Sequence, residues 1–271
     1  MKKNLFFGAL ALFTITQFSA QDKKTAEACM QKADYVCAEE QYTKLAQNET
    51  IQKWKSEYLN NLGMAQRRLG KIPAAFKSYE SALIANPASP TAYANLGALH
   101  YQKGSKTKAL EYLDKGLKVD AENAEMYLTR AKVYESLGKK DLAEKDLKQV
   151  LTFDANNIFA KTGLANFKKR NGDLEGSLKD YNQLLTEKPE SLLYNGRAEV
   201  YLKLKKPKEA LADIEKSIKI DPKFAQTYVI KSQILTDSGN MKEACANLEK
   251  AVALGYEKVM LRDALAKCTK K

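Results

Sequence analysis

Residues 56–89, SEYLNNLGMAQRRLGKIPAAFKSYESALIANPAS, have the pattern of two amphipathic helices joined by a tight turn. Gly70 follows the apolar end of the first helical stretch, where helices commonly end in a left-handed residue that glycine adopts without a Cβ clash. In the second stretch, the small Ala75 permits close helix approach, and Tyr79 follows four residues later on the same face. The stretch therefore predicts a helical hairpin.

The same pattern returns along the chain every 33 or 34 residues. Lys205 stands at the one turn of this series where glycine is missing. Several residue classes repeat in register, which indicates a repeat architecture. The turn glycines are Gly70, Gly104, Gly138, Gly172 and Gly239; the small residues are Ala75, Ala109, Ala143, Ser177, Ala210 and Ala244; the large residues are Tyr79, Leu113, Leu147, Tyr181, Ile214 and Leu248.

This pattern resembles the tetratricopeptide repeat family, whose motif residues are matched in 56–89 by Leu59, Leu62, Gly63, Ala75, Tyr79, Ala82 and Pro87. Six such units cover 56–258, with later units at 90–123, 124–157, 158–190, 191–224 and 225–258. The resemblance implies an all-α, right-handed solenoid of antiparallel helix pairs. Residues 21–55 form a degenerate first hairpin and a junction. Residues 259–271 hold a basic tail and most of a closing helix, whose pattern begins near Tyr256.

Residues 1–20 have the three parts of a secretory signal peptide. Lys2 and Lys3 precede an apolar run over 5–13, and small residues Ser19 and Ala20 offer a cleavage site before Gln21. The run is too short to span a bilayer core of about 30 Å. We therefore expect an exported protein, periplasmic or secreted, that is soluble after cleavage; the alternative is a buried N-terminal helix. The ending FSAQ resembles signal peptides of Bacteroidetes-type bacteria.

The four cysteines form two pairs that are distant in a solenoid. A disulfide needs Cα atoms within about 7 Å, and neighbouring helices pack about 8–10 Å apart, so the two ends of an array cannot be bridged. If the cysteines are oxidised, as export favours, Cys29 pairs with Cys37 and Cys245 with Cys268. Four free thiols are the alternative, which mass spectrometry without reductant distinguishes.

No phosphate loop, dinucleotide fingerprint, zinc-protease helix or nucleophile elbow occurs in the sequence. The single histidine, His100, takes a position that other units fill with Tyr134 or Tyr201, so we interpret it as a packing residue. Carboxylates lie among lysines, as in EKDLK at 144–148, which we interpret as a solvated helix face. We expect no catalysis, cofactor or metal.

The net charge is +12, but the lysines are spread over every unit and interleaved with acids. A nucleic-acid face would need clustered basic residues with stacking aromatics, so we do not expect a nucleic-acid partner. Weak association with an anionic envelope surface remains open. A basic protein that binds envelope polymers or membrane surfaces is therefore the alternative function.

The resemblance implies a binding groove lined by the first helix of each unit. The expected partner is a protein or peptide, and the expected function is that of a non-catalytic scaffold; the oligomeric state stays open. A clamp for a peptide C-terminal carboxylate, as in some family members, is not expected, because Asn60 and Met64 occupy its Lys and Asn positions. The candidate groove residues are Asn60, Met64, Arg67, Arg68, Asn95, Tyr101, Leu128, Lys132, Asn166, Lys169, Arg170, Asn195, Glu199 and Gln233.

Overall fold

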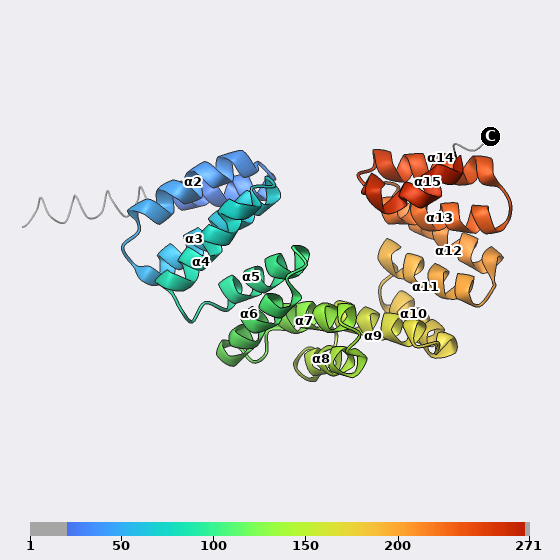
Figure 1. Ribbon diagram of the computed structural model, residues 1–271, viewed down its shortest axis with the longest axis horizontal. Helices are drawn as coiled ribbons and strands as arrows, with labels where there is room; N and C mark the ends of the chain where they lie inside the picture. The colour runs from blue at the N-terminus through green and yellow to red at the C-terminus, as the bar shows by residue number, and fades with distance from the viewer. Residues whose placement is uncertain (1–20, 269–271) are drawn as a thin grey trace, which may run out of the picture. The chain divides into compact units, whose positions relative to one another are not determined.

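The computed structural model describes residues 21–268, whose regular elements are all helices and which contain no strand (Figure 1). The predicted signal peptide at 1–20 lies outside these described residues. The chain divides into two compact units, residues 1–146 and 147–271. Within the first unit, a helical segment covers 21–31, followed by α2 (Tyr35–Asn48), α3 (Gln52–Arg68), α4 (Ile72–Ala85), α5 (Pro90–Gln102), α6 (Lys106–Val119) and α7 (Ala124–Ser136).

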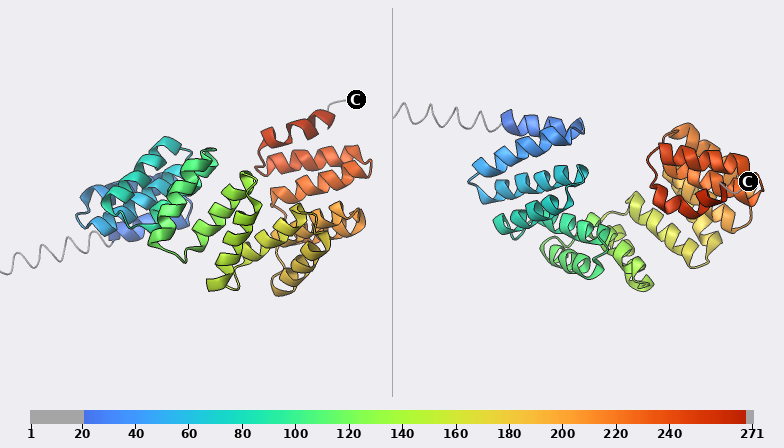
Figure 2. Two further views of the ribbon diagram at one scale, coloured as in Figure 1. Left: turned by 60° about the horizontal axis from the view of Figure 1, so that its bottom comes forward. Right: turned by 45° about the horizontal axis from the view of Figure 1, so that its top comes forward.

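Helix α8 (Lys140–Phe153) crosses the boundary between the units, and the second unit continues with six further hairpin helices and a closing segment. Helices α3, α5, α9, α11 and α13 each pack on the helix that follows them, and successive hairpins of each unit also contact each other (Figures 1 and 2). The chain is therefore an all-α solenoid of helical repeats, as predicted. The second unit contains α9 (Ile158–Arg170), α10 (Leu174–Glu187), α11 (Ser191–Lys203), α12 (Pro207–Ile220), α13 (Ala225–Asp237), α14 (Met241–Ala253), η1 (Lys258–Leu261) and α15 (Arg262–Cys268).

The turn within each hairpin is left-handed, as the recurring glycines predict. Gly70 has a φ of 74°, and the other turn glycines of the series are similar. Lys205 adopts the same conformation, with a φ of 57°, although it carries a side chain. The repeat geometry therefore overrides the local preference of this residue, since a left-handed backbone costs a non-glycine residue about 1–2 kcal/mol.

Close packing within the hairpins depends on small residues. A Cβ atom on Gly63 would lie 2.6 Å from the ring of Tyr79, so only glycine fits there without a shift. Ala75 and Tyr79 are fully buried against Leu96 and Leu99 of the next hairpin. The recurring small and large residues thus form the core that joins one repeat to its neighbour.

Two disulfides join the cysteines in the pairing that the sequence predicts. Cys29 and Cys37 are bridged, with their Cα atoms 5.7 Å apart, and this bond connects the segment 21–31 to α2. Cys245 and Cys268 are bridged with a Cα separation of 5.6 Å, and this bond connects α14 to α15. Each bridge stabilises a described terminal element that has a neighbour on only one side.

The closing segment differs from the single helix that we expect over residues 256–268. It consists of the 3-10 turn η1 followed by the seven-residue helix α15. The turn places Leu261 in a buried cluster with Tyr228, Leu248 and Ala251. Burial of this one leucine accounts for the tighter turn before α15.

The interpretation of residues 144–148 as a fully solvated face is wrong at Asp146. This carboxylate is 4% exposed and accepts two hydrogen bonds from Arg130, at 2.8 and 2.7 Å. The guanidinium of Arg130 also donates to Asp114 at 2.6 Å and lies over the rings of Tyr127 and Tyr134. Arg130 therefore joins α6, α7 and α8 from the interior of the helix stack.

The same cluster recurs 67 residues later around Arg197, at the same phase of the repeat. Arg197 donates two hydrogen bonds to Asp213, both at 2.7 Å, and a third to Asn182. The rings of Tyr194 and Tyr201 lie against its guanidinium. Hydrogen bonding to Asp213 raises the pKa of Arg197, so this arginine stays charged although it is largely buried.

Candidate functional site

The first helices of the repeats carry the candidate groove residues. These helices are α3, α5 and α7 in the first unit and α9, α11 and α13 in the second. Each follows a residue with an extended backbone, and three of them are capped by an asparagine or serine side chain that accepts a backbone N–H. The caps fix where each helix begins and therefore which residues share its faces.

In the first unit, two predicted groove asparagines bind each other. Nδ2 of Asn95 on α5 donates to Oδ1 of Asn60 on α3 at 2.9 Å, and both side chains are buried. The amide of Asn60 also approaches the Sδ atom of Met64, which is exposed. These asparagines join neighbouring repeats. Their amide groups, which we expected to face a peptide, therefore bind each other.

The remaining candidates of the first unit are more open. Arg67 and Arg68 are exposed in the last turn of α3, and Lys132 is exposed on α7. Tyr101 and Leu128 are half-buried, and Tyr101 packs on the cluster around Leu113. The exposed part of this face is therefore basic, with two partly covered apolar side chains.

In the second unit, the candidate residues form pairs across neighbouring elements. Nδ2 of Asn195 donates to Oγ1 of Thr227 on α13 at 2.9 Å. Lys169 on α9 is buried and forms an ion pair with Glu199 on α11. Oδ1 of Asn166 accepts the hydroxyl of Tyr181 at 2.9 Å. Burial raises the pKa of Tyr181 well above its usual value, with a smaller contribution from Glu199, so this hydroxyl stays protonated and donates.

Two buried polar atoms on this face have no hydrogen-bond partner. They are Oγ1 of Thr162 on α9 and Oδ1 of Asn195 on α11, which are equivalent residues of successive repeats. Arg170 and Gln233, the last two candidates, are exposed on α9 and α13. The face thus combines satisfied side-chain pairs with polar groups that still have hydrogen-bonding capacity.

Two exposed apolar residues on these helices were missed by the sequence prediction. Phe159 is 62% exposed and Leu192 is 45% exposed. Each is the second residue of its helix, α9 or α11, and these two helices contact each other. The sequence does show two large apolar residues at the same position of successive repeats. It does not show whether neighbouring residues bury that position.

No group of three His, Cys, Asp or Glu residues in 21–268 could hold a metal ion. His100 is stacked on Tyr112 with ring centroids 5.2 Å apart and lies 4.7 Å from the ring of Phe76. His100 is therefore a packing residue, as predicted. No described helix has both the length and the apolar character needed to cross a membrane.

Curated relatives include two proteins whose names refer to heat-shock proteins. The chain is 26% identical over 232 residues to a heat shock protein sti1 homolog of Schizosaccharomyces pombe, covering 79% of this chain and 36% of that protein. It is 22% identical over 254 residues to an Hsp70-Hsp90 organizing protein of Triticum aestivum, covering 92% of this chain and 43% of that protein. The chain thus spans well under half of the length of these two relatives.

Solved structures show the same fold. A tetratricopeptide repeat protein from Parabacteroides merdae is 29% identical, covers 94% of this chain and all of its own, and superposes with a TM-score of 0.80. Models of the tetratricopeptide repeat match residues 60–121, 124–157, 191–224 and 225–254, which together exceed half of the chain. The repeats, the helix stack and these matches agree, and the chain belongs to the tetratricopeptide repeat family.

Proposed function

We propose that this protein is an exported, non-catalytic scaffold that binds a protein or peptide along the first helices of its repeats. Tetratricopeptide repeat proteins generally mediate protein–protein interactions, and the relatives named after heat-shock proteins fit this role. The observation that carries the proposal is the pair Phe159 and Leu192, two exposed apolar side chains at equivalent positions of neighbouring helices. Exposed apolar groups at one repeat phase favour a partner that buries them.

The polar neighbours of this pair favour a peptide over a purely apolar ligand. Thr162 and Asn195 lie one helical turn after Phe159 and Leu192 and each has an unpartnered oxygen. A peptide offers backbone N–H groups next to its side chains, and a donor that reached these two buried oxygens would satisfy them. Apolar anchors with adjacent amide and hydroxyl groups are the composition expected of a peptide site.

Two features support export. Residues 1–20 have the pattern of a secretory signal peptide, and both disulfides need an oxidising compartment to persist. Fractionation of producing cells, with thiols trapped at lysis, tests this part of the proposal. We expect the chain outside the cytoplasm with both bridges intact; a cytoplasmic chain with four reactive thiols would contradict it.

Binding is tested by affinity capture with the full chain and two single variants. Phe159→Glu and Leu192→Glu each place a charge where the proposal buries an apolar side chain, so we expect both to lose specific partners. Ile220→Glu is the matched control. Ile220 is also exposed, by 48%, but it lies at the end of α12, which is the second helix of its hairpin and not one of the first helices. We call Phe159→Glu and Leu192→Glu the groove variants. Identical partners for these two variants and the control would contradict the proposal. Binding that salt abolishes but that neither groove variant changes would support the envelope-polymer alternative.

A further inference from the structure

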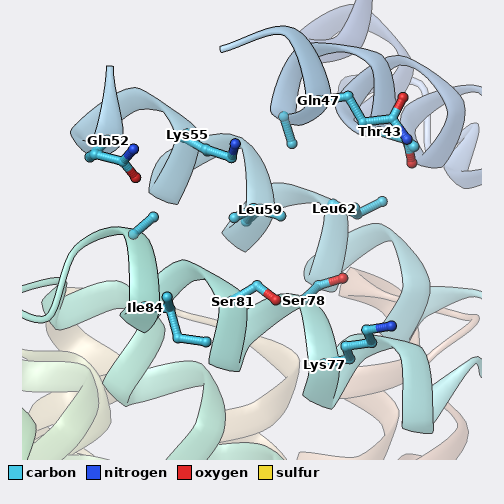
Figure 3. A pocket seen from close by; sticks show the side chains of 12 residues that line it. Thr43, Gln47, Gln52, Lys55, Leu59, Leu62, Lys77, Ser78, Ser81 and Ile84 are labelled. Carbon is cyan, nitrogen blue, oxygen red and sulfur yellow. The ribbon is translucent and has the colours of Figure 1, made fainter. Parts of the chain in front are cut away.

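A second candidate binding surface lies on the second helices of the first two hairpins. Helices α2 and α4 leave an open pocket of about 640 Å³ between them, and α3 forms its floor (Figure 3). Leu59 and Leu62 of α3 line this floor, and Ile84 of α4, which is 82% exposed, stands at the rim. We refer to this pocket as the α2–α4 crevice.

Three later pairs of second helices fill the equivalent space with large side chains. Between α4 and α6, His100 stacks on Tyr112 and contacts Phe76. Between α6 and α8, Arg130 occupies the space with the rings of Tyr127 and Tyr134. The cluster around Arg197 does the same between α10 and α12. The space between successive second helices is therefore one that aromatic and arginine side chains fit.

The α2–α4 crevice lacks these large groups. The residues 34 positions before His100 and Tyr112 are Gln66 and Ser78. Oγ of Ser78, which lines the crevice, donates to Oε1 of Gln66 at 2.7 Å, and Nε2 of Gln66 donates to Glu39 of α2. The arginine of the later clusters is replaced by Leu62. An apolar floor with space for a ring remains open as a result.

The charged residues that line the crevice are all positive. Lys55 and Lys77 line it, and no Asp or Glu is among its lining residues. Neither lysine has an ion-pair partner among the described residues. In the filled clusters of later repeats the positive group is matched by an aspartate, such as Asp146 for Arg130. The crevice lacks such a counter-charge.

We infer that the α2–α4 crevice binds a segment of a partner protein that inserts an aromatic side chain flanked by carboxylates. The ring would cover Leu59 and Leu62, and the carboxylates would pair with Lys55 and Lys77. The partner thus supplies the ring and the acid that later repeats supply for themselves. This inference goes beyond the groove proposal, because the crevice lies between the second helices α2 and α4 of the first unit.

The probe is an acetylated and amidated peptide of sequence Gly-Ser-Glu-Tyr-Leu-Asp-Ser-Gly, titrated into the full oxidised chain. Isothermal titration calorimetry measures the affinity. We expect saturable binding. A peptide with Ala in place of Tyr, and another with Lys in place of Glu and Asp, should each bind at least about tenfold more weakly.

Two variants test the site itself. Gln66→His with Ser78→Tyr installs the residues of the next repeat and fills the crevice, and we expect at least about a tenfold loss of affinity. Lys77→Glu changes only an exposed side chain, so it keeps the test valid if the double variant does not fold; we expect a similar loss. Lys118→Glu, an exposed lysine of α6 away from the crevice, is the matched control and should bind as the wild type does.

Several results would overturn the inference. They are an absence of saturable binding to wild type, equal affinity for the Ala peptide, or equal effects of Lys77→Glu and Lys118→Glu. Sedimentation analysis adds one more: a dimer that Ser78→Tyr dissociates would assign the crevice to a second copy of this chain. The variants that test the groove proposal alter Phe159 and Leu192, which lie in the other unit. The two sets of variants therefore show separately whether the groove proposal or the crevice inference fails.

Discussion

Arg130 and Arg197 show how single residues give individual repeats a different kind of core. Each stands at the repeat phase where the first full unit has Leu62, yet each lies between two tyrosines and binds a buried aspartate in bidentate geometry. A buried ion pair gives little net stability relative to apolar packing, but removing one partner leaves an uncompensated charge. These clusters are therefore sensitive to single substitutions and tolerant of paired ones.

Arg197→Leu should lower the free energy of unfolding by about 3–5 kcal/mol, because Asp213 is only 3% exposed and would lose its counter-charge. The double variant with Asp213→Leu should recover most of this loss, since leucine occupies the arginine position in other repeats. Urea unfolding of both variants measures the difference. Glu40→Gln, in the exposed pair with Lys44, is the control and should change stability little. Equal stability of the single and double variants would contradict the prediction.

His100 gives the chain one isolated pH response. Burial lowers the pKa of His100 below its ordinary value of 6.5, Lys108 lowers it further, and Glu80 and Glu111 act in the opposite direction. The unfolded chain therefore binds a proton more readily than the folded chain does. The stability that the neutral imidazole contributes is fully present above pH 6.5. It is lost as the pH falls from 6.5 through the lower pKa of His100 in the folded chain.

His100→Tyr, which installs the residue found at Tyr134 and Tyr201, should remove this pH dependence. The measurement compares the free energy of unfolding at about pH 7.5 and about pH 5.5 for both proteins, so that carboxylate titration cancels in the difference. We expect the wild type to lose more stability than the variant on acidification. An equal loss would show that His100 does not titrate differently in the folded state.

At the scale of elements, α15 is too short to be stable by itself. It has seven residues, whereas isolated helices shorter than about 12–15 residues are marginal in water. Its described residues include none that is buried, and the bridge from Cys268 to Cys245 attaches it to α14. Three of its residues are partly buried against the apolar cluster around Leu261, so the bridge adds a covalent attachment to a small packing contact.

Cys268→Ser should increase hydrogen exchange in residues 262–268 to nearly unprotected rates, because the seven-residue helix loses its attachment. Protection of η1 should decrease less, since Leu261 stays in its apolar cluster. Mass spectrometry of exchange in the oxidised wild type and the variant measures both. Cys29→Ser, at the other bridge, is the control and should leave α15 unchanged; full protection of α15 in Cys268→Ser would contradict the prediction.

For the whole molecule, the repeat period carried most of the fold prediction. It placed the hairpins and the turn at Lys205, because these depend on phase within a repeat. The length of the array limited the cysteines to two local pairs. It did not reveal that Asp146 is buried, because the lysines around it resemble a solvated face. A charged residue can be placed only when its partner is known, and Arg130 lies on another helix.

The candidate site was less predictable for the same reason. The family resemblance gave the helices, but not which of their residues bind each other. Asn60 and Asn95 turned out to form an inter-repeat hydrogen bond, and Phe159 and Leu192 turned out to be exposed. Both outcomes depend on contacts between successive repeats, which the pattern within one repeat does not contain.

The two bridges also determine how the chain would respond to tension applied at its ends. The bond from Cys245 to Cys268 joins residues 23 positions apart, and that from Cys29 to Cys37 joins residues 8 positions apart. At about 3.5 Å per extended residue, the first shields about 80 Å of contour length and the second about 28 Å. Pulled in an optical trap, the oxidised chain should therefore extend less than the reduced chain by about the sum of these lengths, and force at Cys268 would pass directly to α14.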